Sequence, residues 1–252
     1  MLATERQSRL LELLAASRFA STDDLATELG ASIETIRRDI RVLDQRQALH
    51  RIRGGAVATP SVVDEALFND RRLMHVDEKM TIANLAAGLL STGQTVFLDL
   101  GTTAVQVARA MAMSFSGTVA TTSLQVADVL ARCPAIDVLV CGGRVRGGDL
   151  GCWGAQAVDF FKDVHADVAF IGSGGLDFQS GLTDFHLDEV PTKRQMIASA
   201  RCAYVLADSS KFGVTAPYAV CALDQIDGVI AEVSPPTELQ EALTRGGAHI
   251  IF

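Results

Sequence analysis

The sequence predicts an α/β protein in which a small N-terminal winged helix-turn-helix precedes a larger C-terminal domain with a mostly parallel sheet. Three observations predict this architecture. Segments with helical hydrophobic spacing fill the chain before Leu49 and are broken by a tight turn at Gly30. A basic segment with a Gly54-Gly55 turn follows them. From Asp77 onward, nearly continuous apolar strands alternate with helices, which is typical of a parallel sheet covered on both faces.

The segment from Ser32 to Leu43 has the features of the recognition helix of a helix-turn-helix, which enters the major groove of DNA. Ser32 is a good N-cap, because its hydroxyl can accept a hydrogen bond from a free amide of the first turn. Apolar residues recur at the spacing of one buried helix face: Ile33, Ile36, Ile40 and Leu43. Arginines lie between them, and arginine pairs bidentately with guanine or phosphate. The alternative is a solvated basic face on an ordinary amphipathic helix.

A basic segment from Ala48 to Val57 is predicted to form a two-stranded wing. Leu49 and Ile52 are its apolar residues, and Gly54-Gly55 supplies the turn. Arginines there can reach phosphate or a narrow minor groove. The predicted DNA contacts are Ser32, Thr35, Arg37, Arg38, Arg41, Arg51 and Arg53, of which Thr35 and Arg38 are expected to reach base edges.

The net charge of −8 is unevenly distributed along the chain. Residues 1–57 hold nine arginines and eight carboxylates, a net charge of +1, so the remainder carries −9. Acid is therefore concentrated in the part that is not expected to touch DNA. No apolar run of membrane-spanning length and no signal-peptide pattern occurs, and the five scattered cysteines lack a C-x-x-C pair. We expect reduced thiols, no zinc site and a cytoplasmic protein.

Three parts are predicted: a DNA-binding domain over 1–57, a linker over 58–76 and a ligand-binding domain over 77–252. Thr59-Pro60-Ser61 interrupts the pattern and is the expected hinge, and the charged segment from Asp64 to Arg72 is expected to form a short helix.

Polar and glycine-rich loops follow several predicted strands of the second domain. Ligands of parallel α/β sheets bind at the carboxyl ends of the strands. Gly101-Thr102-Thr103 opens a helix, whose free amides favour an anion, and it matches no nucleotide-binding motif. Glu189 and Lys193 also have the i, i+4 spacing of a surface ion pair. The predicted ligand-binding residues are Asp99, Gly101, Thr102, Thr103, Thr122, Ser123, Gly142, Gly143, Arg144, Glu189, Lys193, Asp208 and Lys211.

These motifs together resemble the DeoR family of bacterial transcription regulators. The resemblance rests on the segments Ser32–Ile40, Arg53-Gly54-Gly55 and Asp99–Thr103, and it continues to the C-terminal third through Gly142–Arg146, Glu189–Arg194 and Asp208–Phe212. It implies a sensor domain with the fold of ribose-5-phosphate isomerase and the CoA-transferases, which binds phosphorylated sugars or polyols. The stretch from Thr183 to Lys193 is similar to the glycerol-3-phosphate repressor branch. Thr121-Thr122-Ser123 departs from the more usual Thr-Asn-Ser, and Ala231-Glu232 from Thr-Asp.

The leading hypothesis is a repressor of a carbohydrate or polyol operon, controlled by a phosphorylated effector whose phosphate lies at Gly101-Thr102-Thr103. Its expected partners are double-stranded operator DNA, the effector and further copies of the chain, in a dimer or tetramer, without a cofactor, metal or membrane. One alternative is a sugar-phosphate isomerase in which Glu189, Asp208, Lys193 and Lys211 serve as acid and base. Another is a structural DNA-bridging protein. The sequence leaves open the effector, the operator and whether the effector releases or strengthens DNA binding.

Overall fold

The computed structural model describes residues 3–17, 19–45, 48–58 and 68–252. Contacts divide the chain into two compact units, Met1–Met74 and His75–Phe252. The division falls inside the predicted linker. The predicted hinge at Thr59-Pro60-Ser61 lies outside the described residues, and of the helix predicted from Asp64 only the part from Phe68 is described.

The N-terminal unit has the helix-turn-helix order that the sequence predicts. Its helices are α1 (Ala3–Ser17), α2 (Thr22–Leu29), α3 (Ile33–Gln45) and α4 (Phe68–Leu73). The Ser21 hydroxyl caps α2 through the amide of Asp24, and Gly30 ends it in the left-handed conformation, with φ of 58°. The Ser32 hydroxyl accepts from the amide of Thr35 at 3.2 Å, as the N-cap prediction requires.

The wing is a three-stranded antiparallel sheet rather than the predicted pair of strands. Its strands are β1 (Phe19–Ser21), β2 (Leu49–Ile52) and β3 (Gly55–Ala58), in the order β1-β3-β2. β1 was missed because it is only three residues long. Gly55 permits its approach, since a Cβ there would lie 2.3 Å from the carbonyl oxygen of Ala20.

The core of this unit contains the predicted apolar face of α3 with one exception. Ile36, Ile40 and Leu43 are buried against Leu10, Leu14 and other apolar residues of α1 and α2. The prediction that Ile33 is buried is wrong, because 40% of this residue is exposed. At 3.6 residues per turn, Ile33 falls on the edge of the apolar stripe that adjoins Arg37 rather than at its centre.

The C-terminal unit is built on a seven-stranded sheet in which every pair of neighbours is parallel, as predicted. The strand order is β15-β14-β12-β9-β4-β5-β6. The strands are β4 (Thr95–Leu98), β5 (Gly117–Thr121), β6 (Ile136–Val140), β9 (Ala166–Gly172), β12 (Ala200–Leu206), β14 (Gly228–Ile230) and β15 (His249–Ile251).

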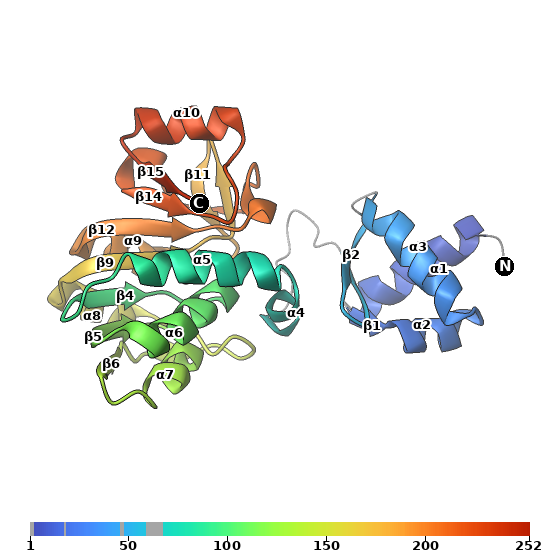
Figure 1. The fold of residues 1–252 in the computed structure, drawn as a ribbon, viewed down its shortest axis with the longest axis horizontal. Helices are drawn as coiled ribbons and strands as arrows, with labels where there is room; N and C mark the ends of the chain where they lie inside the picture. Colours follow the sequence, from blue (N-terminus) through green and yellow to red (C-terminus); the bar gives the residue numbers. More distant parts are fainter. Residues whose placement is uncertain (1–2, 18, 46–47, 59–67) are drawn as a thin grey trace. The chain divides into compact units, whose positions relative to one another are not determined.

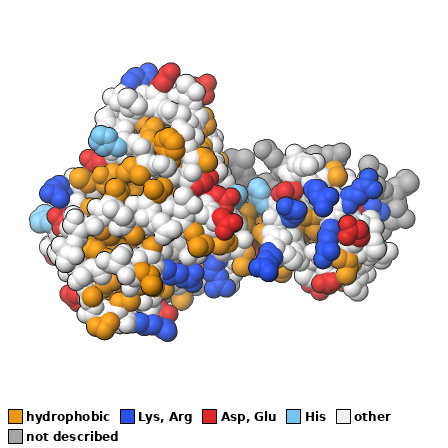
Figure 2. All heavy atoms as spheres, in the orientation of Figure 1, with side chains coloured by type: hydrophobic (Ala, Val, Ile, Leu, Met, Phe, Trp, Pro, Cys, Tyr) orange, Lys and Arg blue, Asp and Glu red, His pale blue; other side chains and the backbone are white. Residues whose placement is uncertain are grey.

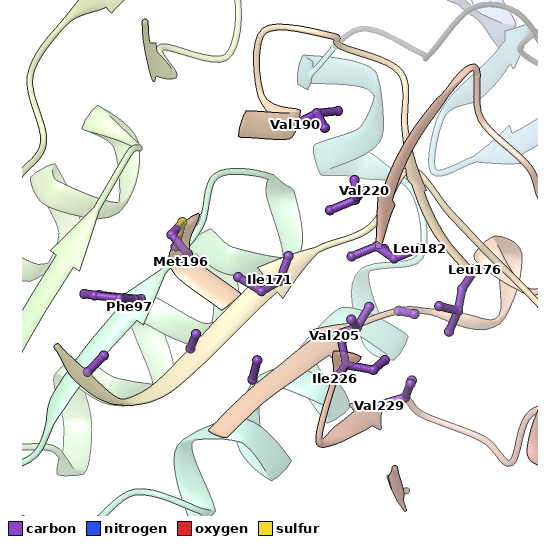
Figure 3. Packing of buried hydrophobic residues seen from close by; sticks show 14 of the residues in the cluster. Phe97, Ile171, Leu176, Leu182, Val190, Met196, Val205, Val220, Ile226 and Val229 are labelled. Atoms are coloured by element: carbon purple, nitrogen blue, oxygen red, sulfur yellow. The ribbon is translucent and has the colours of Figure 1, made fainter. Parts of the chain in front are cut away.

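Helices cover both faces of this sheet (Figure 1). α5, α6 and α7 pack in sequence on one face, and α8 and α9 pack together on the other. The helices are α5 (Val76–Gly88), α6 (Thr102–Ser114), α7 (Leu124–Leu130), α8 (Ala155–Asp163), α9 (Val190–Ser199) and α10 (Thr237–Arg245). Side chains of the central strands, including Phe97, Ile171 and Val205, pack with Met196 of α9 in one apolar cluster (Figure 3).

Smaller elements extend the carboxyl edge of the large sheet. An antiparallel sheet has the order β10-β11-β13, and a hairpin joins β7 to β8. These elements are β7 (Arg144–Val145), β8 (Cys152–Trp153), β10 (Gly175–Asp177), β11 (Gly181–Asp184), β13 (Tyr218–Cys221) and the 3₁₀ turns η1 (Ser209–Lys211) and η2 (Leu223–Gln225). None of the described helices is long and apolar enough to span a bilayer.

Candidate functional site

The loops that follow neighbouring strands of the large sheet meet, as the topology predicts. Asp99 follows β4 and is only 1% exposed. Its carboxylate accepts a hydrogen bond from the amide of Gly172 at the end of β9, at 2.9 Å, and a longer one, 3.5 Å, from the hydroxyl of Thr122 after β5. Three strand ends therefore converge on this one buried carboxylate.

Lys193 of α9 joins the same group. Its Nζ lies 2.5 Å from Asp99 Oδ2, 3.2 Å from Asp184 Oδ2 and 3.5 Å from Glu189 Oε2, and its side chain is only 3% exposed. Lys193 also donates to the carbonyl oxygen of Gly172 at 3.3 Å. The alternative of a surface ion pair for Glu189 and Lys193 is therefore wrong. The i, i+4 spacing is real, but α9 starts at the carboxyl edge of the sheet, where its first turns are buried.

The surroundings of Lys193 leave no room for a side chain at Gly172, the last residue of β9. A Cβ at Gly172 would lie 2.9 Å from the carbonyl oxygen of Leu100, 3.3 Å from Asp99 Oδ2 and 3.5 Å from Lys193 Nζ. Glycine thus lets the loop after β4 and the start of α9 approach the end of β9.

Arg146 is a member of the cluster that we did not predict. It follows β7 and pairs with Asp149 and with Glu189, which links the β7–β8 hairpin to α9. The signal was present, because the glycine motif that begins at Gly142 ends on Arg146. We chose Arg144 instead, and that residue is exposed with its guanidinium 5.2 Å from the centre of the Trp153 ring. Arg144 therefore stacks on the hairpin instead of joining the cluster.

Burial and charge perturb the ionisation of this cluster. Burial and the negative charge of Asp184 raise the pKa of Glu189 to about 7, although Lys193 and Arg146 oppose the shift. Burial alone would lower the pKa of Lys193, but the carboxylates around it raise that pKa well above its usual value. Acid exceeds base here, since among the described residues the carboxylates of Asp99, Asp149, Asp184 and Glu189 pair with two cations, Lys193 and Arg146.

The first turn of α6 lies three residues beyond Asp99. Gly101 is its N-cap, with φ of 121°, and no side chain caps this helix end. The first amides of a helix have no acceptor within the helix. Thr102 is buried and Thr103 partly exposed, and each carries a hydroxyl in this turn. The turn offers hydrogen-bond donors and the positive end of the helix dipole to an anion.

The other predicted residues of the neighbouring loops have structural contacts. The hydroxyl of Ser123 is buried and caps α7 through the amide of Val126, at 3.2 Å. Gly142 and Gly143 are exposed and have positive φ values of 70° and 98°. A Cβ at Gly143 would lie 2.6 Å from the carbonyl oxygen of Trp153, so this glycine admits the β8 strand.

Asp208 and Lys211 form a separate group after β12. Asp208 is buried and accepts hydrogen bonds from the amide and hydroxyl of Ser210. Burial would raise the pKa of Asp208, but the charge of Lys211, the Ser210 hydrogen bond and the charge of Lys79 on α5 together lower it. No hydrogen bond or ion pair among the described residues joins this group directly to Lys193.

Thr192, next to Lys193 on α9, was not predicted. Its Oγ1 is the one buried side-chain polar atom that has no hydrogen-bond partner among the described residues. Buried hydroxyls are normally paired, so this atom is available to a bound molecule. A single threonine in a helix carries no sequence signal for such a role. Within the described residues, no group of His, Cys, Asp or Glu side chains is arranged to hold a metal ion, and the five cysteines are free thiols.

The N-terminal unit presents the predicted arginines of α3 to solvent. Arg37, Arg38 and Arg41 are all exposed, and basic side chains gather on the face of this unit that carries α3 (Figure 2). Thr35 is only partly exposed, and its hydroxyl lies 2.8 Å from that of Ser32. The hydroxyls of Ser32 and Thr35 therefore order the start of α3, beside its exposed arginines.

The wing arginines are exposed as well. Arg51 lies on β2 and Arg53 in the turn before β3. The amide of Arg51 donates to the carboxylate of Asp44, near the end of α3, at 3.0 Å. This bond ties the wing to α3, so the two basic segments form one continuous structure.

A buried ion pair holds α3 against α1. Arg6 Nε lies 2.6 Å from Asp39 Oδ2, and Gln7 donates to Asp39 Oδ1 at 2.9 Å. Asp39 is 4% exposed, and it projects from the face of α3 opposite the exposed arginines. No role was predicted for Asp39 from the sequence.

Comparisons with known proteins cover almost the whole chain. The family described as "DeoR-like helix-turn-helix domain" matches residues 6–62, and "DeoR C terminal sensor domain" matches residues 74–233. The glycerol-3-phosphate regulon repressor of Escherichia coli (strain K12) is 32% identical over 97% of this chain and 96% of its own. The HTH-type transcriptional repressor GlcR of Bacillus subtilis (strain 168) is 32% identical over 100% of this chain and 96% of its own. Among solved structures, ribose 5-phosphate isomerase A from Methanocaldococcus jannaschii matches 55% of each chain, with 17% identity and a TM-score of 0.41.

Proposed function

The chain belongs to the DeoR family of DNA-binding transcription regulators, and on that premise we propose that it is a repressor controlled by a phosphorylated sugar or polyol. One relative is named for the glycerol-3-phosphate regulon, so small polyol phosphates are the first effectors to test. Since operator DNA is its target, the proposed location is the cytoplasm.

The observation that carries the effector proposal is the uncapped first turn of α6 beside the buried Asp99–Lys193 pair. The unit carries excess acid, so an anion is admitted only where donors gather, and the Gly101-Thr102-Thr103 turn supplies them. Carboxylates such as Glu189 are suited to accept hydrogen bonds from the hydroxyl groups of a sugar or polyol. The unpaired hydroxyl of Thr192 is a further group that a ligand can satisfy.

The relatives are named as repressors, which supports a regulator rather than an enzyme. The ionisation of Lys193 agrees with that conclusion. Lys193 is held charged by three carboxylates, and a lysine with a strongly raised pKa is a poor general base. Its role in the proposal is to hold the strand ends together for the ligand.

We propose that α3 and the wing bind operator DNA through the exposed arginines Arg37, Arg38, Arg41, Arg51 and Arg53. One winged helix covers too few base pairs for operator-grade affinity, so a homo-oligomer on repeated half-sites completes the proposal. Light scattering of the free and DNA-bound chain tests this, and a monomer in both states contradicts it.

Calorimetry of the full chain tests the effector site. Glycerol 3-phosphate, glucose 6-phosphate and ribose 5-phosphate are titrated beside glycerol, glucose and ribose. At least one phosphate is expected to bind far more tightly than its parent compound. The double variant Thr102→Ala, Thr103→Ala is expected to lose most of that difference and to retain DNA binding.

The matched control is Thr81→Ala. Thr81 is exposed on α5, and its hydroxyl donates to the carbonyl oxygen of Asp77 within the same helix. This variant should bind the phosphate as the unmodified chain does. Equal affinity for a phosphate and its parent compound in the unmodified chain would show that the first turn of α6 is not a phosphate site.

A further inference from the structure

We propose that Ile33 contacts the 5-methyl group of a thymine in the major groove and is thereby a specificity-determining residue of the operator complex. The inference rests on the proposed role of α3 as the recognition helix. It goes beyond that role, because it assigns one base type to one side chain.

The position of Ile33 is the first observation. It is the first residue of α3, directly after the Ser32 cap, and the N-terminal residues of a recognition helix are the ones that meet base edges. Ile33, Arg37 and Arg41 are spaced i, i+4, i+8 and so follow one stripe along the helix. Ile33 therefore shares its exposed face with two of the arginines proposed to bind DNA.

The exposure of Ile33 is the second observation. Of this residue, 40% is accessible, whereas Ile36 and Ile40 one and two turns further on are at most 2% exposed. Its neighbours on the solvent face are charged: the side chains of Glu34 and Arg37 are 85% and 62% exposed and lie 3.9 Å apart. A branched apolar side chain that keeps this much exposure buries its remaining apolar surface only against a partner.

The chemistry of the groove selects the partner. An isoleucine side chain has no hydrogen-bonding atom, so it cannot read the donors and acceptors of guanine, cytosine or adenine. Thymine alone presents a methyl group in the major groove, and apolar contact is the way in which proteins recognise it. Burial of one methyl between Ile33 and the base corresponds to about a fourfold gain in affinity per half-site.

The experiment removes the same methyl group from the DNA. A duplex is first selected from a random library with the full-length chain. Each thymine of the selected duplex is then replaced singly by uracil, which pairs identically but lacks the 5-methyl group. For the unmodified chain, uracil at one position of each half-site is expected to weaken binding about fourfold. Ile33→Ala is expected to bind the thymine and uracil duplexes equally well.

Ile33→Val and Met113→Ala complete the set. Valine keeps the two γ-methyl groups and should retain part of the thymine preference. Met113 lies on α6 of the other unit, is 87% exposed, and its replacement should leave the full preference. The inference is overturned if the unmodified chain is indifferent to every uracil, or if Ile33→Ala keeps the same thymine-to-uracil ratio at every position. If no duplex is enriched in the first selection, the proposed DNA recognition fails as well, so the two failures are distinguishable.

Discussion

Each unit of this chain holds a buried ion pair, and the two differ in how completely charge is matched. In the N-terminal unit, the single carboxylate of Asp39 receives both Arg6 and Gln7, at 2.6 and 2.9 Å. In the C-terminal unit, Lys193 faces three carboxylates, and the pKa of one of them, Glu189, is raised to about 7. The first arrangement is satisfied by the protein alone, whereas the second retains excess negative charge.

The difference matches the tasks proposed for the two units. A recognition helix must keep one orientation, and a fully paired carboxylate between α1 and α3 favours that orientation. A sensor must differ in free energy between its ligand-free and ligand-bound states. A cluster with unmatched carboxylates can provide this difference by taking up or releasing a proton, by changing its ion pairs, or by accepting hydrogen bonds from hydroxyl groups of the ligand. The following predictions test this contrast, beginning with the largest expected effect.

Replacement of Lys193 by methionine should be the most damaging change. Three buried carboxylates would lose their shared cation, and removing one partner of a buried ion pair typically costs about 3–5 kcal/mol. Urea unfolding followed by the fluorescence of Trp153, the single tryptophan of the chain, measures this in the C-terminal unit. The control Lys162→Met breaks an exposed pair with Asp159, 2.7 Å long, and should cost less than about 1 kcal/mol. Equal losses of unfolding free energy in Lys193→Met and Lys162→Met would show that the buried cluster does not depend on Lys193.

The raised pKa of Glu189 predicts a dependence of stability on pH. Between the ordinary glutamate pKa near 4.5 and about 7, the folded chain holds a proton that the unfolded chain releases. The free energy of unfolding should therefore fall as the pH rises through this window, by as much as about 3 kcal/mol. Glu189→Gln should lack this component, and Glu241→Gln, an exposed position on α10, should keep it. Parallel pH profiles for Glu189→Gln and the unmodified chain would show that Glu189 does not carry the effect.

Replacement of Asp39 by asparagine should loosen α3 to a smaller degree. The side chain of Arg6 is 14% exposed and keeps some contact with water. The expected loss in the free energy of opening α3 is therefore about 2 kcal/mol. Amide hydrogen exchange of α3 in the full chain measures the loss. Asp128→Asn removes the carboxylate of the exposed Arg132 pair and should leave every protected amide unchanged. Unaltered exchange of α3 in Asp39→Asn would show that the buried pair does not hold this helix.

Most helices of the N-terminal unit and several strands of the large sheet could be predicted from periodicity and caps, whereas the ion pairs could not. Ser21, Gly30 and Ser32 carry local signals that mark helix ends, and the apolar run at β4 marks a buried strand. Arg6 and Asp39 are 33 residues apart, and Asp99 and Lys193 are 94 residues apart. Only the fold brings such residues together, so their pairing has no local pattern.

The errors in the sequence predictions have the same origin. Glu189 and Lys193 match the spacing of a surface pair, and nothing local says that α9 begins at a buried sheet edge. Ile33 fits the apolar period of α3, and only the packed helices show that the buried face begins at Ile36. Arg146 was not predicted, because no local pattern shows that this arginine, rather than Arg144, pairs with Glu189.

The smallest predicted effect compares one helix cap in each unit. Ser32 is exposed and Ser123 fully buried, yet each hydroxyl accepts from a backbone amide at 3.2 Å. Loss of a serine cap costs about 0.5–2 kcal/mol, and water can replace the lost acceptor only where the helix end is exposed. Ser123→Ala should therefore lower the free energy of unfolding by about 2 kcal/mol, measured by Trp153 fluorescence. Ser32→Ala should lower the free energy of opening α3 by about 0.5 kcal/mol, measured by hydrogen exchange of the α3 amides. Equal costs would mean that burial does not set the energy of these caps, and the same reasoning would then fail for the larger difference between the two ion pairs.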